Sequence, residues 1–229
     1  MSMNQPFEPR PVLFPPVISF LLMANGLVFL LQLFAFEPLL VNFALWPLGT
    51  PEIVEQQGER VWVPQFHIWQ LVSYGFLHGG LLHLFLNLFA MWMLGVQLEN
   101  AWGSRLFAIY FFVCVVGAGL IQLAVASHGV LNAEIYPTIG ASGGVFGILL
   151  AFGMMFPNQR LIFILLPIPI KAKYFVIAYG AFELFAGMTG TTAGVAHFAH
   201  LGGMLFGLLL IQYWRGRLPI RPRRRVFWW

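Results

Sequence analysis

Charged residues are scarce in this chain, and their scarcity indicates its class. Only 9% of the 229 residues are charged and 59% are hydrophobic, whereas a soluble domain carries about 25% charged residues. Because so few charged residues cannot cover a water-facing surface, most of the surface must face lipid. Cysteine is nearly absent too, and the single Cys114 excludes a disulfide within the chain. These absences predict an integral membrane protein without an internal disulfide.

The formal net charge of +4 comes mainly from the C-terminal tail. Six arginines cluster there: Arg215, Arg217, Arg221, Arg223, Arg224 and Arg225. A basic tail after a hydrophobic helix is typical of the cytoplasmic side of a membrane, so we expect no nucleic-acid partner. The proline-rich N-terminus does not resemble a cleaved signal peptide, and we expect the first span to insert directly.

Apolar runs that reach or approach the length of a membrane-spanning helix predict six spans. They lie near residues 17–39, 76–98, 105–127, 140–156, 174–188 and 194–213. Pro167 and Pro169 break a further apolar stretch at 161–170, which we expect to be an interfacial loop rather than a seventh helix. The predicted fold is an all-α membrane protein, a six-helix bundle that forms a single domain over residues 1–229.

The basic residues predict the orientation of the bundle. Six spans put both termini on one side, and if that side is cytoplasmic, eleven of the twelve basic residues lie inside and only Arg60 lies outside. Residues 1–16 are then a cytoplasmic N-terminal segment and residues 214–229 a basic cytoplasmic tail. The outside segment 40–75 carries three tryptophans and is expected to lie in the membrane interface.

Polar side chains interrupt the second predicted span at His78, His83 and Asn87. His83 and Asn87 are four residues apart and share a helical face, whereas His78 is offset by five residues. A polar group inside a membrane is costly and marks a functional site by default. Hydrogen bonding that holds the bundle together is the alternative for any one of them, but three on one helix favour a site.

The fourth predicted span begins with the small-residue run Gly140-Ala141-Ser142-Gly143-Gly144. Such a run also permits close helix packing, so it is weak evidence alone. A serine at a helix N-terminus, however, has free backbone N–H groups nearby that can stabilise an oxyanion on a substrate carbonyl. We expect the Ser142 N–H, His83 and Asn87 to hold that oxyanion.

The sixth predicted span carries a histidine followed by glycines, in the run Ala199-His200-Leu201-Gly202-Gly203. Gly203 and Gly207 form a GxxxG pair that permits close contact with another helix. If that helix is the fourth span, His200 reaches Ser142 and can act as its base. His197 lies on a neighbouring face and is the competing candidate.

Aspartate is absent from the whole chain, which excludes a Ser-His-Asp triad. Glu134 lies in the loop before the serine and Glu183 in the fifth span, but no motif places either beside His200. We therefore predict a catalytic dyad of Ser142 and His200. The chain has no H-E-x-x-H string and no carboxylate near the membrane histidines in sequence, so we expect neither a metal nor a cofactor.

Taken together, these motifs resemble those of the rhomboid intramembrane serine proteases. The matching strings are H-x-x-x-x-H-x-x-x-N at His78 to Asn87, G-x-S-G at Gly140 to Gly143, A-H-x-G-G-x-x-x-G at Ala199 to Gly207, and G-x-x-x-E-x-x-x-G at Gly95 to Gly103. The resemblance runs from about Trp69 to Gly207. Four motifs in the right order are far more specific than any one of them.

The resemblance implies a protease that cleaves other transmembrane helices near their outer end. Ser142 would be the nucleophile and His200 the base, His83 and Asn87 the oxyanion side chains, Gly140 a support of the site, and His78 a mainly structural residue. The fifth span and the loop 188–193 would form a mobile gate and cap. The alternative is an inactive rhomboid-like protein that binds transmembrane helices. A transporter or channel would predict paired half-helices or a repeat, and the sequence has neither.

Two positions depart from the family pattern. Trp69-Gln70 stands where the family often has Trp-Arg, which leaves the anchoring of the outside segment open. Phe146 stands where some members carry a tyrosine against the catalytic histidine, so a hydroxyl is lost and an aromatic ring is kept. The compact six-span layout and the lack of a transit peptide favour a bacterial inner membrane.

Overall fold

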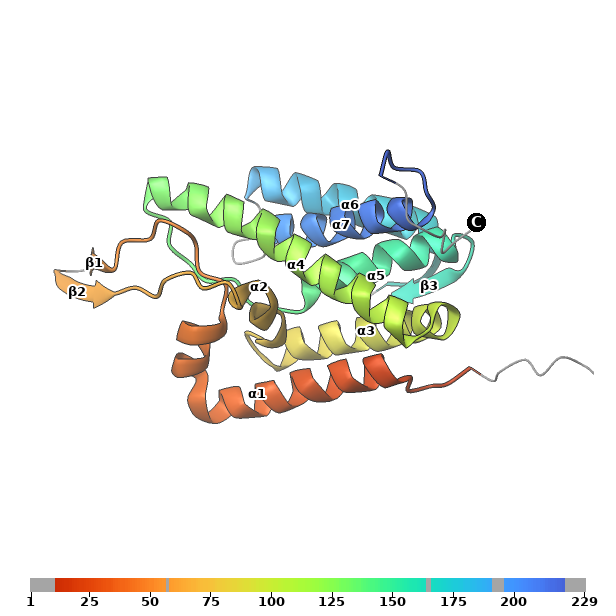
Figure 1. Cartoon of the computed structure of the whole chain (residues 1–229), viewed down its shortest axis with the longest axis horizontal. Helices are drawn as coiled ribbons and strands as arrows, with labels where there is room; N and C mark the ends of the chain where they lie inside the picture. Colours follow the sequence, from red (N-terminus) through yellow and green to blue (C-terminus); the bar gives the residue numbers. More distant parts are fainter. Residues whose placement is uncertain (1–10, 57, 164–165, 191–195, 221–229) are drawn as a thin grey trace, which may run out of the picture.

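The computed structural model describes residues 11–56, 58–163, 166–190 and 196–220. Most of these residues are helical, and each of the six predicted ranges overlaps a helix. These helices are α1 (Pro16–Phe43), α3 (Leu81–Trp102), α4 (Ser104–Gly129), α5 (Ser142–Met155), α6 (Ala172–Thr189) and α7 (His197–Trp214), which pack side by side (Figure 1). By length and composition, α1, α3 and the helical stretch Ser104–Asn132 can cross a membrane; α5 is a shorter apolar helix.

The predicted terminal and cap segments lie partly outside the described residues. Arg10 and most of the N-terminal segment are not described, and neither are Arg221 to Arg225. Residues 191–193 of the expected cap loop and residues 194–195 at the start of the sixth predicted span also lie outside the described residues. The start of α1 and the end of α7 lie at the same end of the bundle (Figure 1).

The all-α prediction is wrong in two places. In the outside segment, β1 (Ile53–Gln56) and β2 (Glu59–Trp62) form an antiparallel hairpin. A second hairpin pairs β3 (Arg160–Phe163) with β4 (Leu166–Lys171), so the stretch expected to be a loop is extended. Because each sheet has two strands, every strand is an edge strand, where proline is tolerated.

The second predicted span begins later than expected. Residues 70–76 form the short helices α2 (Gln70–Ser73) and η1 (Tyr74–Phe76), and α3 starts only at Leu81. His78 therefore precedes α3 and does not lie on it, which corrects the predicted helical offset between His78 and His83. His83 and Asn87 are on α3, and the Asn87 amide donates to the His83 carbonyl oxygen at 2.9 Å.

Glu99, near the end of α3, holds the start of α1. Its carboxylate accepts hydrogen bonds from the backbone N–H groups of Val17 (2.9 Å) and Ile18 (2.8 Å), and from the Ser104 hydroxyl (2.6 Å). The first N–H groups of a helix have no partner within it, and α1 has no side-chain cap of its own. Glu99 satisfies two of them, so the glutamate of the G-x-x-x-E-x-x-x-G string joins α1 to α3.

Glycines bring α4, α5 and α7 into close contact. A Cβ on Gly203 of α7 would overlap the carbonyl oxygen of Gly143 on α5, and a Cβ on Gly207 would overlap the Tyr110 hydroxyl on α4. Likewise, a Cβ on Gly147 of α5 would overlap the Cys114 sulfur on α4. Small residues at such crossings let helix backbones approach closely. The GxxxG pair of α7 therefore packs against two helices, with Gly203 facing the N-terminal turn of α5.

Candidate active site

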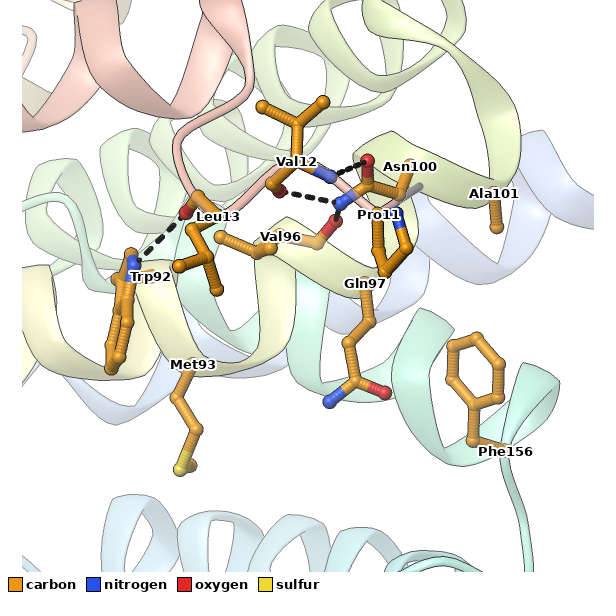
Figure 2. Close-up of a pocket in the computed structure, with 10 residues that line it drawn as sticks. All are labelled: Pro11, Val12, Leu13, Trp92, Met93, Val96, Gln97, Asn100, Ala101 and Phe156. Carbon is orange, nitrogen blue, oxygen red and sulfur yellow. Dashed lines mark hydrogen bonds between the residues drawn. The ribbon is translucent and has the colours of Figure 1, made fainter. Parts of the chain in front are cut away.

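A cavity of about 560 Å³ lies between the segment before α1 and the second half of α3 (Figure 2). Among its lining residues, Asn100 exchanges two hydrogen bonds with the Val12 backbone, at 3.0 and 2.8 Å, and the Trp92 indole donates to the Leu13 carbonyl oxygen at 3.3 Å. None of the ten lining residues is a nucleophile, an acid or a base. The chemistry that the sequence predicts must lie elsewhere.

Ser142 is the first residue of α5, and its hydroxyl faces His200 on α7. The distance from Ser142 Oγ to His200 Nε2 is 2.8 Å, within the range over which a hydroxyl proton passes to an imidazole. His200 is buried, whereas Ser142 is partly exposed. The contact is possible because α5 and α7 cross at Gly143 and Gly203. Of the two candidate bases, His200 is thus the one that bonds the serine.

Glu183 of α6 lies directly beside His200, contrary to the sequence prediction. Its Oε2 atom is 2.9 Å from His200 Nδ1 and 2.6 Å from His197 Nδ1, and all three side chains are buried. The predicted pair of Ser142 and His200 thus has a buried carboxylate directly beside it. The signal that would have found Glu183 is the cost of an unpaired carboxylate in a membrane helix, which demands a partner on a neighbouring helix.

The carboxylate determines which ring nitrogens carry hydrogen. An ionised carboxylate only accepts hydrogen bonds, so His200 and His197 each donate an Nδ1–H to Glu183. Neutral His200 then has no hydrogen on Nε2, the atom that faces the Ser142 hydroxyl. This is the tautomer that a general base needs.

The His200 ring is covered by an aromatic ring from α5. Phe146 stacks on it with ring centroids 4.1 Å apart and planes 5° from parallel. The Tyr179 ring of α6 packs in turn against Phe146, with the two ring centroids 5.0 Å apart. Phe146, in place of the tyrosine that some members carry, therefore still packs an aromatic ring against His200.

His83 of α3 faces the same small space as Ser142. Its Nδ1 accepts a hydrogen bond from the Gly79 N–H at 3.3 Å, so its Nε2 carries the hydrogen and is a donor. A Cβ on Gly140 would lie 3.0 Å from His83 Nε2 and 3.7 Å from Ser142 Oγ. Asn87 is buried one turn further along α3, with its amide bonded to the His83 carbonyl oxygen.

Gly140 lies in the turn that leads into α5. Its φ of 129° is in a region that favours glycine, and its N–H donates to the Tyr74 carbonyl oxygen at 2.9 Å. Tyr74 is itself fixed, because its hydroxyl donates to the Val115 carbonyl oxygen at 2.8 Å. Burial raises the pKa of Tyr74, so this hydroxyl stays protonated and remains a donor. Gly140 is thereby held beside His83 and Ser142.

His78 joins the site to α1. Its backbone N–H donates to Gln32 Oε1 at 2.9 Å, and Gln32 Nε2 donates to the His78 carbonyl oxygen at 3.1 Å. The His78 ring is buried and packs edge-on against His83, with centroids 5.0 Å apart. Gln32 was not among the predicted residues, although a buried glutamine in a membrane helix is itself an unusual polar group.

Gln70 anchors the outside segment. Its Oε1 accepts from the backbone N–H groups of Trp46 (3.3 Å) and His67 (3.2 Å). Its Nε2 donates to the carbonyl oxygens of Gln65 (3.3 Å) and Asn42 (3.5 Å). The side chain is completely buried. A neutral amide thus does the anchoring at the position where arginine is common.

Glu183, His197 and His200 are also residue types that bind metals, and their ligand atoms lie within 4.8 Å of one another. No carboxylate lies near these histidines in sequence, but the packing of α6 against α7 brings Glu183 beside them. The two contacts to Glu183 Oε2, at 2.6 and 2.9 Å, are hydrogen-bond distances. Ligand atoms around a tetrahedral zinc ion stand roughly 3.3 Å apart, so an ion would have to replace both hydrogen bonds.

Comparison with known proteins places this geometry in context. Residues 65–217 match the Rhomboid domain. Rhomboid protein 1, mitochondrial, of Saccharomyces cerevisiae is 29% identical over 157 residues, 68% of this chain and 44% of the yeast protein. Rhomboid-like protease 3 of Toxoplasma gondii is 27% identical over 162 residues, 69% of this chain and 56% of that protein. Presenilin-associated rhomboid-like protein, mitochondrial, of Homo sapiens is 31% identical over 159 residues, 63% of this chain and 39% of the human protein.

The mitochondrial relatives contradict the predicted bacterial inner membrane. The chain spans about half the length of the curated relatives it matches. The lack of a transit peptide in this stretch therefore carries no information about location.

Proposed function

The chain belongs to the rhomboid family, and from that premise we propose that it is an intramembrane serine endopeptidase. Its substrates are transmembrane helices of other proteins, cut near one end of the span. The observation that carries the proposal is the 2.8 Å contact between Ser142 Oγ and His200 Nε2 at the crossing of α5 and α7.

The reaction is an acyl transfer in two halves. Ser142 Oγ attacks the scissile carbonyl carbon while its proton moves to His200 Nε2, and the electron pair of the C=O bond moves to the oxygen. His200 then returns the proton to the leaving nitrogen as the C–N bond breaks. Water attacks the resulting ester and gives one proton to His200, which passes it to Ser142 as the serine leaves.

The developing oxyanion needs donors in place before the reaction. The His83 Nε2–H and the free backbone N–H groups at the start of α5 supply them, since both border the space beside Ser142 and Gly140. Asn87 supports this side of the site from one turn along α3. No cofactor or metal takes part in the proposed steps.

The bundle crosses the membrane six times in this proposal, with the lipid bilayer around α1 and α3 to α7. The start of α1 and the end of α7 lie at one end of the bundle, as an even number of crossings requires (Figure 1). A substrate helix must unwind locally, because its scissile carbonyl has to reach Ser142. The names of the yeast and human relatives support a mitochondrial location.

An inactive rhomboid-like protein that binds helices without cutting them is the competing function. Such a protein does not need a serine that is hydrogen-bonded to a histidine, and here both residues are present and in contact. The name of the Toxoplasma gondii relative, a protease, also favours activity.

Cleavage of a model transmembrane substrate by the purified chain in detergent tests the proposal. The parent chain should cut, and Ser142→Ala and His200→Ala should reduce the rate to background. The matched control is His128→Ala, at an exposed position on α4. Cleavage that persists in Ser142→Ala would sink the proposal, and an inactive parent chain would favour the binding protein.

A further inference from the structure

Glu183 contacts two histidines through a single oxygen atom. Its Oε2 atom is hydrogen-bonded to His200 Nδ1 at 2.9 Å and to His197 Nδ1 at 2.6 Å, in a buried site between α6 and α7. Glu183 is the carboxylate that both histidines contact. The serine, the two histidines and the glutamate therefore form one continuous chain of hydrogen bonds.

We propose that the site works as a four-residue chain, Ser142–His200–Glu183–His197, in which Glu183 is a positioning residue for His200 and His197 is a positioning residue for Glu183. This inference rests on the proposed function. It replaces the dyad with an arrangement in which a glutamate from α6 does what an aspartate does in a serine-protease triad.

The case for Glu183 is both geometric and electrostatic. Its hydrogen bond holds the His200 ring in the plane that points Nε2 at Ser142, and it keeps the hydrogen on Nδ1. When His200 takes the serine proton it becomes a cation, and a carboxylate at 2.9 Å stabilises that cation strongly because the site is buried. The Nδ1 hydrogen stays on His200 throughout, so Glu183 remains ionised and gains no proton.

His197 has a separate task in this chain. A carboxylate on a helix can rotate about its side-chain bonds, and a second donor on the same oxygen removes that freedom. The 2.6 Å bond from His197 also draws negative charge toward itself, which keeps Oε2 from pulling the Nδ1 hydrogen off His200. Both histidines come from the first turn of α7, so Glu183 is clamped from one helix face.

The alternative is that Glu183 only joins α6 to α7. A purely structural link would change the amount of folded protein and its thermal midpoint, whereas a positioning residue changes kcat in protein that remains folded. The relevant variants are Glu183→Gln, Glu183→Asp and His197→Gln. Glu134→Gln, at an exposed loop position, is the control for the same chemical change.

The measurement is kcat and KM for a fluorogenic model transmembrane peptide in detergent micelles, with the thermal midpoint of each variant. We expect Glu183→Gln to lower kcat about 100-fold with KM within about twofold, because the amide keeps an acceptor but loses the charge. Glu183→Asp should recover at least tenfold of that loss. His197→Gln should lower kcat about tenfold, and Glu134→Gln should match the parent.

Two results would overturn the inference. One is a folded Glu183→Gln variant whose kcat stays within about twofold of the parent while Ser142→Ala is inactive, which leaves a dyad. The other is a loss of kcat that tracks the thermal midpoint and is not recovered by Glu183→Asp, which leaves a structural link. Cleavage that survives Ser142→Ala is a different outcome, since it removes the proposed function itself. If Glu183→Gln does not fold, His197→Gln and Glu183→Asp decide by the same criteria.

Discussion

The ring of Phe146 lies flat against the ring of His200, with centroids 4.1 Å apart and planes within 5° of parallel. The stack comes from two different helices, α5 and α7, and one of them also carries Ser142. Phe146 therefore covers a flat face of the imidazole, whereas Glu183 bonds the edge of the ring at Nδ1.

Truncation of Phe146 should loosen His200 without removing any group that exchanges protons. We expect Phe146→Ala to lower kcat at least tenfold and to cost about 3 kcal/mol or more of stability, because a large buried ring is lost. Phe146→Tyr should keep kcat within about threefold, since the aromatic face is retained. Kinetics and thermal unfolding of the two variants check this, and equal activity in all three proteins would show that the stack does not position the base.

The crossing of α5 and α7 should not tolerate a single methyl group. Gly203→Ala places a Cβ on the carbonyl oxygen of Gly143, which must separate the helices and lengthen the bond between Ser142 and His200. We expect a loss of stability of about 1–3 kcal/mol and a drop in activity of at least tenfold. Gly26→Ala on α1, where a Cβ meets nothing within 4 Å, is the control and should behave like the parent.

Removal of the His83 side chain should weaken the oxyanion site and leave the base intact. We expect His83→Ala to lower kcat by roughly 10²–10³-fold, the usual cost of one oxyanion donor. His128→Ala, at an exposed position near the end of α4, carries the same chemical change and should be neutral. Unchanged kcat in folded His83→Ala would mean that the backbone donors at the start of α5 suffice.

Loss of the Gln70 side chain should release the outside segment. Gln70→Ala removes an amide that bonds four backbone groups, of which the Asn42 carbonyl oxygen keeps its bond from the Trp69 indole. The other three lose their partner, and we expect a cost of about 3 kcal/mol or more, since each buried group left unsatisfied costs roughly 1–3 kcal/mol. The control is Gln97→Ala, since Gln97 lines the cavity of Figure 2, away from the outside segment. Limited proteolysis within residues 40–69 provides the readout, and equal protection in both variants would contradict the assigned role.

The sequence predicts those parts of the fold that depend on local pattern. Apolar runs locate the six helices because burial in lipid acts on each run separately. The glycines around Ser142 and after His200 predict a close crossing because the missing side chains are what permits it. His83 is predicted from the sequence because a polar side chain inside a membrane helix is costly and marks a functional site.

Contacts between distant segments were harder to predict. Glu183 meets His200 only because α6 and α7 pack together, and no short motif records that pairing. The position of His78 was misjudged because the chain enters α3 through Gly79 and Gly80, which delay the helix to Leu81. The two hairpins are pairings of short strands in segments whose proline and tryptophan content indicated only an interfacial location.

The most direct test of the account is the site at which a fluorophosphonate probe attaches to the chain, read by mass spectrometry of the labelled protein. We expect a single adduct on Ser142 that is lost in His200→Ala and retained in His128→Ala. An adduct on another residue, or labelling of Ser142 that is undiminished in folded His200→Ala, would contradict the claim that His200 activates Ser142.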